Sequence, residues 1–379
     1  MTEHFLAPLH SWLATPMSDD VSSAIRRLRR APDVQHVAVM PDVHLAEDVC
    51  VGVAIGTARL LYPQAVGGDI GCGMLAVPFD VEAERVREPR TAARILAGLG
   101  RSIPARRRNR GEAISMPDAL ARPALSDARL EGLWRSAGTS EFATVGSGNH
   151  FVELQSDEAA RLWLMVHSGS RALGPAIRDH HLAPAEPVGG GLRVLDTEVD
   201  SGTAYLNDAA WARRFADANR RQIAVLAGEI VSGIAGGRLQ WEASITTDHN
   251  HAEQETHGAK RLWVHRKGAM PAWPDQAGVL PGSMGSLSYH VVGRGCPEAL
   301  CSSAHGAGRL LSRTDARKSI TNRDLQRQMR DVRYDFRLTE RLRDEAPSAY
   351  RDITAVARAQ RDLVKIVRVL WPVLSYKGV

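Results

Sequence analysis

Short apolar runs that end in glycine-rich turns recur along this chain of 379 residues and restrict the folds it can adopt. The runs typical of strands and their loops lie at 34–61, 65–80, 151–154 and 162–167. Residues 204–235 carry apolar side chains at helical spacing and predict the longest helix, and residues 81–137 predict further helix. The stretch 260–310 predicts strands and glycine turns again, and the remainder is expected to be mostly helical. Because strands and helices mix without a regular strand–helix–strand rhythm, we expect an α+β fold with mixed sheets.

The composition limits where the chain resides and how it is divided. No segment approaches the ~18 consecutive apolar residues that a membrane span needs, so we expect no membrane partner. The first residues lack a basic and then apolar signal region, and four cysteines are too few for a secreted disulfide framework, so we expect a cytoplasmic protein. No linker divides the chain, and the polar residues considered below run from 42 to 377. We therefore expect a single domain over residues 1–379 around one central site.

The basic residues are almost all arginine. The formal net charge is +5, and the 48 basic residues comprise 43 arginines and only 5 lysines. A GC-rich genome explains most of this excess, although the planar fork of arginine also suits phosphate groups and favours an RNA or nucleotide partner. Because arginine is so strongly preferred over lysine in this chain, the few lysines are candidates for specific roles, and we single out Lys267 and Lys377.

One turn combines a carboxylate and a thiol. The segment Gly67-Gly68-Asp69-Ile70-Gly71-Cys72-Gly73-Met74 has the glycines for a sharp turn, and Asp69 and Cys72 could hold a divalent cation there. The simpler interpretation is a glycine turn with an inert buried cysteine. Histidines beside other small-residue turns favour the metal interpretation, and they are His150, His167 and one of His249, His251 and His257. This mixture of nitrogen, oxygen and sulfur suits Mn, Co, Fe or Zn better than Ca or Mg.

Further segments have phosphate- or base-binding character. In Ser303-Ala304-His305-Gly306-Ala307-Gly308-Arg309, glycines precede a predicted helix, whose exposed N–H groups would attract an anion. His305 could serve as an acid, a metal ligand or a nucleophile, or be incidental. The strand period of two sends Asn149, Phe151 and Glu153 to one side and His150 to the other. Glu153 could thus accept N–H groups of a base, while Arg266-Lys267-Gly268-Ala269 and Pro281-Gly282-Ser283-Met284-Gly285 resemble phosphate-binding loops.

Taken together and in order, these segments resemble the RtcB family of RNA ligases. The stretches that carry the resemblance are MPDVHL at 40–45, GGDIGCGM at 67–74, GSGNHFVEL at 146–154, VHSGSR at 166–171, DHN at 248–250, HRKGA at 265–269, PGSMG at 281–285, HGAGR at 305–309 and YKG at 376–378. They span the chain from about residue 36 to the C-terminus.

The resemblance implies an enzyme that uses GTP and two Mn²⁺ ions to join RNA ends. It implies that the metal ligands are Asp69, Cys72, His150, His167 and His249, with Cys72 bridging the ions. It implies that His305 takes GMP from GTP through a P–N bond. The residues expected to hold the guanosine nucleotide are Asn149, Phe151, Glu153, Ser283, His305, Gly306, Ala307, Gly308, Tyr350 and Lys377.

The implied substrate is RNA with a 3′-phosphate or 2′,3′-cyclic phosphate end and a second end with a 5′-hydroxyl. Arg171 and Arg309 are expected to position its backbone. The chain departs from the family pattern at Ala46-Glu47-Asp48-Val49-Cys50 and in the run RRRNR at 106–110. These departures leave open the RNA substrate, the role in tRNA splicing or RNA repair, and the need for an archease-like activator.

Two other classes of function fit parts of the pattern. A metal-dependent phosphoesterase acting on cyclic or 3′-terminal phosphates would need the metal ligands but no guanosine pocket. A non-catalytic RNA- or nucleotide-binding metalloprotein would need neither His305 chemistry nor GTP.

Overall fold

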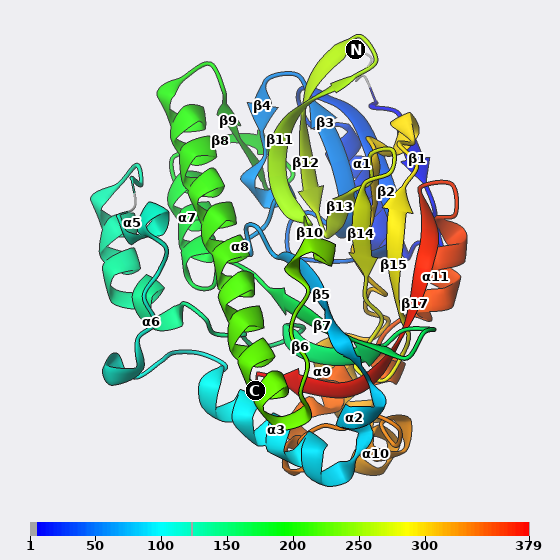
Figure 1. Cartoon of the computed structure of the whole chain (residues 1–379). Coiled ribbons are helices and arrows are strands. Elements are labelled where there is room, and N and C mark those ends of the chain that lie inside the picture. The colour runs from blue at the N-terminus through cyan, green and yellow to red at the C-terminus, as the bar shows by residue number, and fades with distance from the viewer. Residues whose placement is uncertain (1–5, 123, 379) are drawn as a thin grey trace, which may run out of the picture.

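Two β-sheets form the centre of the structure, and helices lie around them (Figure 1). The computed structural model describes residues 6–122 and 124–378. Helices and strands are mixed along the chain, so the expected α+β class is confirmed. Within the described residues, no helix has both the length and the apolar character needed to cross a membrane.

One sheet of five strands has a parallel pair at its edge, where β1 pairs with β2, and is otherwise antiparallel. Its strands, in spatial order, are β1 (Leu9–Ser11), β2 (Val34–His44), β3 (Val51–Thr57), β12 (Lys260–Lys267) and β11 (Asn250–His257).

The other main sheet has seven strands and is antiparallel throughout its described pairings. Its strands, in spatial order, are β10 (Ile245–Asp248), β5 (Gly73–Glu82), β7 (Arg161–Ser168), β6 (Phe151–Ser156), β17 (Val364–Lys377), β15 (Ser288–Gly293) and β14 (Ala277–Leu280). Two small sheets complete the β-structure and consist of β13 (Ala269–Pro271) with β16 (Ser302–Ala304), and β4 (Leu60–Leu61), β9 (Leu192–Asp196) and β8 (Glu186–Gly189).

The helices are α1 (Asp19–Arg29), α2 (Glu84–Arg87), α3 (Pro89–Ser102), α4 (Asp118–Ala121), α5 (Ala128–Leu133), α6 (Thr139–Glu141), α7 (Leu173–Leu182), α8 (Asp200–Ala235), α9 (Arg313–Ser319), α10 (Asn322–Gln328) and α11 (Ile353–Ala359). The long helix expected at 204–235 is α8, which ends where Gly236 adopts a φ of 80°. Its buried residues Ile223, Ala224, Ala227 and Val231 follow the helical period and pack with β5, β6 and β7.

Two sequence expectations differ from the structure. Among the described residues of 81–137, only α3 is a helix of three or more turns, and the others form short helices and loops. The C-terminal part was expected to be mostly helical, yet residues 364–377 form β17. The charged residues that precede this strand favour helix, whereas Val364, Leu370, Val373 and Leu374 of the strand are buried in hydrophobic clusters of the core. Pro372 is accommodated because the pairing with β6 shifts register between Pro372 and Leu374.

The two main sheets meet at His249. This residue lies between β10, which belongs to the seven-stranded sheet, and β11, which belongs to the five-stranded sheet. The chain therefore passes from one sheet to the other at a residue that faces the central cleft.

Candidate metal and nucleotide site

The cleft lies where strands of the seven-stranded sheet begin or end. Met74, His167, Phe151 and Lys377 are register neighbours across β5, β7, β6 and β17. Antiparallel pairing thus brings together residues that are far apart in sequence. All four line one cleft, with a volume of about 310 Å³.

The glycine turn before β5 has a backbone path that side chains would block. Gly71 has a φ of 71°, and a Cβ there would lie 2.8 Å from the Cα of Arg213 on α8. The amide of Cys72 donates a hydrogen bond to the carbonyl of Asp69 at 3.0 Å. The turn therefore packs tightly on α8 and presents Asp69 and Cys72 on the same side.

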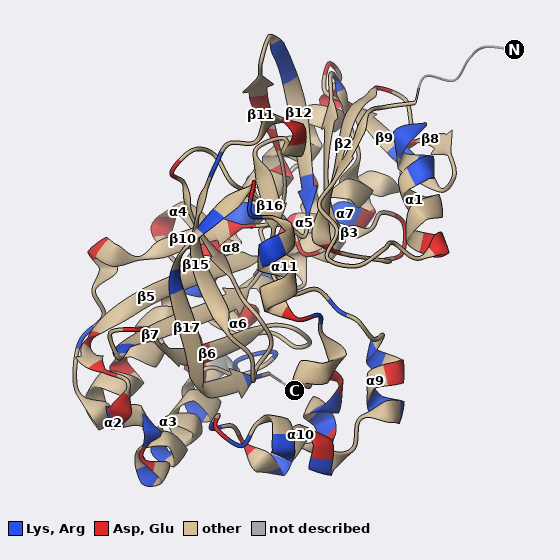
Figure 2. Cartoon of the chain, turned by 90° about the vertical axis from the view of Figure 1, so that its right-hand side faces the viewer, with Lys and Arg blue, Asp and Glu red and all other residues tan. Residues whose placement is uncertain are grey.

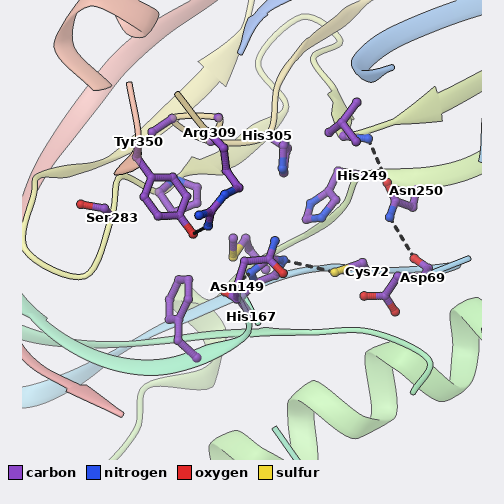
Figure 3. A pocket seen from close by; sticks show the side chains of 18 of the residues that line it. Asp69, Cys72, Asn149, His167, His249, Asn250, Ser283, His305, Arg309 and Tyr350 are labelled. Carbon is purple, nitrogen blue, oxygen red and sulfur yellow. Dashed lines mark hydrogen bonds between the residues drawn. The ribbon is translucent and has the colours of Figure 1, made fainter. Parts of the chain in front are cut away.

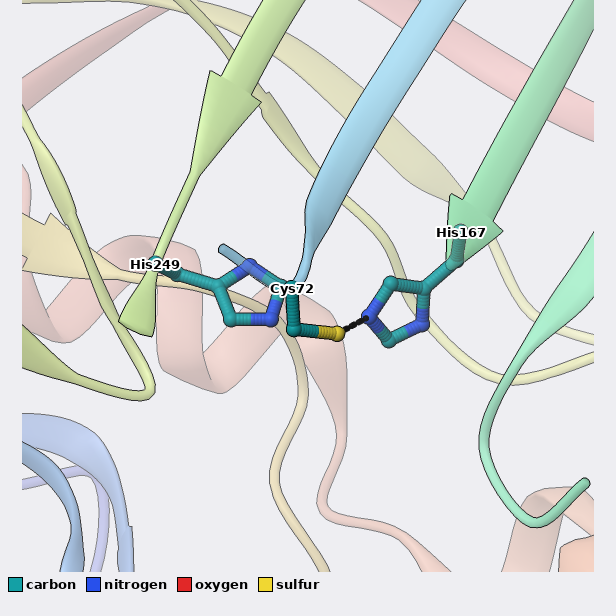
Figure 4. A group of neighbouring side chains, drawn as sticks. All are labelled: Cys72, His167 and His249. Atoms are coloured by element: carbon teal, nitrogen blue, oxygen red, sulfur yellow. Dashed lines mark hydrogen bonds between the residues drawn. The ribbon is translucent and has the colours of Figure 1, made fainter. Parts of the chain in front are cut away.

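The first donor group consists of Cys72, His167 and His249, which are buried and whose donor atoms lie within 4.8 Å of one another. Figure 4 shows the thiol of Cys72 between the two imidazole rings. Nε2 of His167 lies 3.1 Å from Sγ of Cys72, while its Nδ1 lies 3.1 Å from the carbonyl oxygen of Asn149. With the proton on Nδ1, the lone pair of Nε2 faces the thiol. Burial lowers the pKa of His167 and of His249 well below the usual value, which keeps both rings neutral and able to bind a cation.

The second donor group consists of Asp69, Cys72 and His150 and shares Cys72 with the first. Nε2 of His150 lies 2.9 Å from Oδ2 of Asp69 and 3.3 Å from Sγ of Cys72. Although burial opposes ionisation of Asp69, the nearby His150 lowers the pKa of this carboxyl to about 2. Asp69 is therefore a carboxylate at neutral pH.

The thiol of Cys72, which both donor groups share, can bind a cation well only after it loses its proton. Burial, with the neighbouring Asp69 carboxylate, raises the pKa of Cys72 well above its usual value. A thiolate at this position needs cations beside it. One sulfur common to two groups with nitrogen and oxygen donors fits a pair of transition-metal ions. The structure thus brings together the five residues expected as ligands, and their role as ligands stays a prediction.

A buried arginine of α8 fixes the backbone around these donors. Nη1 of Arg220 donates to the carbonyl of Gly71 at 2.7 Å and to that of Ser168 at 3.0 Å. It thereby joins the turn that carries Cys72 to the end of the strand that carries His167. Nothing in the sequence indicates this role of Arg220, because a helical arginine gives no local sign that its guanidinium is buried.

His305 lies across the cleft from the shared thiol. It follows β16, and its ring centroid lies 4.6 Å from that of His249. Nδ1 of His305 lies 2.7 Å from Oδ2 of Asp42, whose side chain is completely buried. This contact leaves Nε2 as the nitrogen available to a ligand. Figure 3 shows His305 between Cys72 and Asp69 on one side and Ser283 and Tyr350 on the other. Asp42 belongs to the segment MPDVHL, but sequence reasoning assigned it no role.

The loop after His305 differs from the expected helix N-terminus. Helix α9 begins only at Arg313, and its first turn is capped by the side chain of Ser312, which accepts from the amide of Asp315. Gly306, Ala307 and Gly308 still line the cleft. Gly308 has a φ of 70°, and a Cβ there would lie 2.5 Å from the carbonyl oxygen of Asp42. The loop therefore follows the wall of the cleft closely.

Arg309 is engaged within the protein. Its guanidinium donates to Leu311, Glu345, Tyr350 and the carbonyl of Asp344, at 2.6–3.1 Å. It also lies over the ring of Tyr350, 4.9 Å from its centroid. Arg309 thus holds Tyr350 in place, and these contacts give no support to its expected direct role in RNA positioning.

One end of the cleft has an aromatic and acidic lining, which begins at Asn149 and Phe151 beside the donor residue His167. Its residues include the expected nucleotide contacts Asn149, Phe151, Glu153, Ser283, Tyr350 and Lys377. As expected from the strand period, Phe151 and Glu153 line this cleft, whereas His150 is not part of its lining and contacts Asp69. Burial raises the pKa of Glu153 to about 8. Its Oε1 accepts from Nε2 of Gln155 at 2.7 Å.

Glu345 organises this end of the cleft and was missed in the sequence. Oε2 of this buried carboxylate accepts from Nζ of Lys377 at 2.6 Å and from the hydroxyl of Tyr350 at 2.6 Å. Although burial opposes ionisation, Lys377 lowers the pKa of Glu345 below its usual value. Nζ of Lys377 also lies 5.7 Å from the ring centroid of Phe151. The rare lysine that attracted attention in the sequence is therefore part of the cleft wall.

The structure separates the three histidines among which spacing alone did not choose. His249 lines the cleft, whereas His251 belongs to a separate group with Glu253 and Glu255. His257 lies near that group, 2.9 Å from Glu255. Nη1 of Arg266 lies 3.3 Å from His251 and also binds Glu255, so a guanidinium already supplies the positive charge there.

Comparison with known proteins identifies relatives along almost the whole chain. The family model described as "tRNA-splicing ligase RtcB" matches residues 24–131 and 121–378. The "RNA-splicing ligase RtcB" of Escherichia coli K12 is 34% identical, with 98% of each chain covered. The protein of the same name from Mycobacterium tuberculosis is 28% identical over 89% of this chain and 96% of its own length. The "tRNA-splicing ligase RtcB" of Nanoarchaeum equitans is 28% identical over 91% of this chain and 88% of its own.

Proposed function

The chain belongs to the RtcB family, and from that premise we propose that it is an RNA ligase that uses GTP and two Mn²⁺ ions to join a 3′-phosphate end to a 5′-hydroxyl end. The observation that carries this proposal is the position of His305. It lines the same cleft as Cys72, which the two donor groups share, and as Phe151 and Tyr350. A nucleophile, a cation site and a base pocket in one cleft are the parts that nucleotidyl transfer needs.

The donor groups fit manganese. One ion would be held by Cys72, His167 and His249 and the other by Asp69, Cys72 and His150. When bound, the ions would offset the negative charge of the triphosphate and of the RNA phosphate. The protein contributes neutral imidazoles, an ionised carboxylate and a rigid backbone held by Arg220.

His305 is the proposed nucleophile in the first step. Asp42 holds Nδ1, so Nε2 can present its lone pair to the α-phosphorus of GTP. The new bond joins Nε2 to this phosphorus, and the bond from phosphorus to the bridging oxygen breaks. Pyrophosphate leaves, and GMP remains on His305. Asp42 stabilises the positive charge that develops on the ring.

The guanosine is proposed to lie at the end of the cleft lined by Asn149, Phe151, Glu153, Ser283, Tyr350 and Lys377. The aromatic rings of Phe151 and Tyr350 offer faces for stacking. Ionised Glu153 can accept N–H groups from the base. Gly306, Ala307 and Gly308 leave the loop beside His305 free of large side chains, so the phosphates can approach it closely.

The later steps transfer GMP and then join the RNA. An oxygen of the RNA 3′-phosphate attacks the phosphorus on His305, and the P–N bond breaks. The 5′-hydroxyl of the second end then attacks the activated 3′-phosphorus, loses its proton, and releases GMP. An RNA with a 2′,3′-cyclic phosphate would first be opened by water to the 3′-phosphate. The proposed partners of the protein are thus RNA ends and GTP. An archease-like activator and a role in tRNA splicing or RNA repair belong to the same proposal.

The test is covalent labelling with GTP radiolabelled at the α-phosphate in the presence of Mn²⁺. We expect an adduct that is labile in acid and stable in alkali, as a P–N bond is. His305→Asn should abolish it. His44→Gln is a matched control, because His44 also lines the cleft but its Nδ1 is directed at the carbonyl of Asp42. Equal labelling of wild type and His305→Asn would refute the assignment of the nucleophile.

A further inference from the structure

A basic segment lies beside the second donor group, outside the cleft. We call residues 103–107 the basic rim; they follow α3 and end in Arg106 and Arg107. These arginines begin the run RRRNR, which departs from the family pattern. The function proposed above assigns nothing to them.

Backbone contacts fix the basic rim against the loop that carries Asn149 and His150. The amides of Val145 and Gly146 donate to the carbonyls of Pro104 and Ala105 at 3.1 and 2.9 Å. On the other side, the hydroxyl of Tyr376 near the end of β17 donates to the carbonyl of Ile103 at 2.7 Å. The basic rim is therefore held between two segments that form the site.

A carboxylate links the basic rim to Arg171. Nε of Arg107 lies 3.1 Å from Oε1 of Glu141, and the other oxygen of Glu141 accepts from the amide of Ala172 at 2.9 Å. The guanidinium of Arg171 reaches back to the rim and lies 3.5 Å from the carbonyl oxygen of Ala105. It also lies 3.4 Å from Nδ1 of His150, which is in the second donor group. Contacts through Glu141 and the carbonyl of Ala105 thus connect Arg107 and Arg171 to this donor group, and we call these two arginines together with Arg106 the basic surface.

The members of this surface and the neighbouring Arg108 have different roles. Arg108 is structural, because it donates to the carbonyls of Ser102, Phe142 and Ala143. Arg107 has Glu141 as a partner, whereas Arg106 is exposed and pairs with no carboxylate among the described residues. Arg171 has a φ of 58°, a backbone conformation that a non-glycine residue rarely adopts without cause. Glu141 pairs with Arg107, whereas neither Arg106 nor Arg171 forms an ion pair among the described residues, so positive charge is left for a partner.

We propose that the basic rim binds backbone phosphates of the RNA strand as it leaves the catalytic cleft past His150, with Arg106 as its principal contact. This inference rests on the proposed function for the identity of the RNA. Phosphate groups match the chemistry, since arginine binds them through a planar fork and since contacts to the backbone position a strand without reading its sequence.

Another arginine-lined groove supplies a matched control. It lies between α1 and the turn that joins β8 to β9, and its lining includes Arg26, Arg27 and Arg30. Figure 2 shows that basic residues also occur on α1, α9 and α10, together with acidic ones. Arg30 is exposed, as Arg106 is, but none of the contacts described above connects it to the donor groups.

The experiment measures binding of a fluorescent single-stranded RNA with a 3′-phosphate to the full chain loaded with Mn²⁺, over a range of salt concentrations. Arg106→Ser should weaken binding about fivefold at low salt and reduce the slope of log K against log[salt] by about 0.7, the value for one phosphate contact on a single strand. Arg106→Lys should keep most of the affinity and most of the salt dependence of the wild type, because the positive charge is kept. Arg30→Ser should leave the affinity and its salt dependence unchanged.

Unchanged affinity and slope in Arg106→Ser would overturn the proposal, as would an equal loss in Arg30→Ser. Thermal unfolding of each variant checks that the exposed substitutions leave the fold intact. Labelling by GTP is measured on the same wild-type preparation. Absence of the adduct would refute the proposed function without affecting the binding result, so the two failures are distinguishable.

Discussion

At the scale of single residues, Cys72 has the most connected position in the site. It is the one residue common to both donor groups formed around Asp69, His150, His167 and His249. Its pKa is raised by burial, so the free protein holds a thiol there, and a thiolate requires cations. The loss of this sulfur should therefore affect both proposed ions, whereas loss of any other donor should affect one.

Metal content tests this distinction. We expect Cys72→Ser to lose both Mn²⁺ ions under conditions in which His249→Gln and Asp69→Asn each lose about one, since each of the latter leaves one donor group complete. Elemental analysis of protein dialysed at a fixed free Mn²⁺ concentration measures the number bound. Retention of one ion by Cys72→Ser would show that the sulfur does not bridge.

The ionisation of Glu153 gives a second prediction at this scale. In the free protein its pKa is about 8, so the carboxyl is largely protonated at pH 7. Since N–H groups of guanine need an ionised acceptor, binding must release a proton below pH 8. The affinity for guanosine, which carries no phosphate, should rise about tenfold per pH unit from pH 6 towards 8 and then level off. Calorimetric titrations in two buffers measure the released proton, and Glu153→Gln should bind weakly with no such pH dependence. A flat profile in the wild type would contradict this role.

At the scale of elements, α8 positions the site although it supplies none of the proposed metal ligands. Arg220 ties the turn before β5 to the end of β7, and Asn219 donates to the carbonyl of Thr144 and the hydroxyl of Ser168. The sequence predicted this helix from its apolar period, but the period identifies only which face is buried. Which polar residues on that face reach a distant turn depends on tertiary packing, and this explains why Arg220 and Asn219 were missed.

Arg220 provides a prediction for this element. Arg220→Met should lower the free energy of unfolding by about 3 kcal/mol, because the carbonyls of Gly71 and Ser168 lose their buried donor. The matched control is Arg221→Met, since Arg221 is exposed and, among the described residues, pairs with Asp217 of the same helix alone. Denaturant unfolding of the metal-free proteins measures both. Equal stability of the two variants would show that Arg220 does not hold the turn.

In strand β17 the sequence indicated a functional residue but not the element that carries it. The segment YKG and the rarity of lysine identified Lys377 as a candidate, yet the surrounding residues were expected to be helical. Short motifs are visible in sequence because they combine glycine with a polar residue. The strand that carries Lys377 is specified by pairing with β6 and β15, which are distant in sequence. For the same reason Glu345, which binds Lys377, had no detectable signal.

At the scale of the whole molecule, two sheets are joined at the residue that completes the first donor group. His249 lies where β10 of one sheet leads to β11 of the other, so the geometry of that group depends on how the sheets sit together. The α+β class could be predicted from the sequence, and so could many of the residues that line the cleft. The division into two main sheets could not be predicted. Nor could the contact of Asp42 with His305 or that of Gln155 with Glu153, because these contacts arise only when distant segments pack.

Buried histidines outside the site predict how stability changes with pH. Burial lowers the pKa of His265 to about 4 and that of His290 to about 3. The unfolded chain has an ordinary value near 6.5, so below this pH it binds protons that the folded chain does not, and stability falls as pH falls from about 6.5 towards 4. Each histidine contributes a slope of about 1.4 kcal/mol per pH unit in this window. In urea unfolding series, His265→Asn should reduce the slope between pH 6 and 5, and an unchanged slope would contradict the neutral state of His265.

The most direct test of the central claim is a single-turnover joining reaction with the purified chain. The substrates are an RNA with a 3′-phosphate and another with a 5′-hydroxyl, in the presence of Mn²⁺ and with or without GTP. We predict a joined product that requires GTP, whose new linkage contains the phosphate of the 3′ end, and that is absent with His305→Asn. Removal or opening of terminal phosphates without joining, equal with and without GTP and unaffected by His305→Asn, would contradict the account and indicate a phosphoesterase.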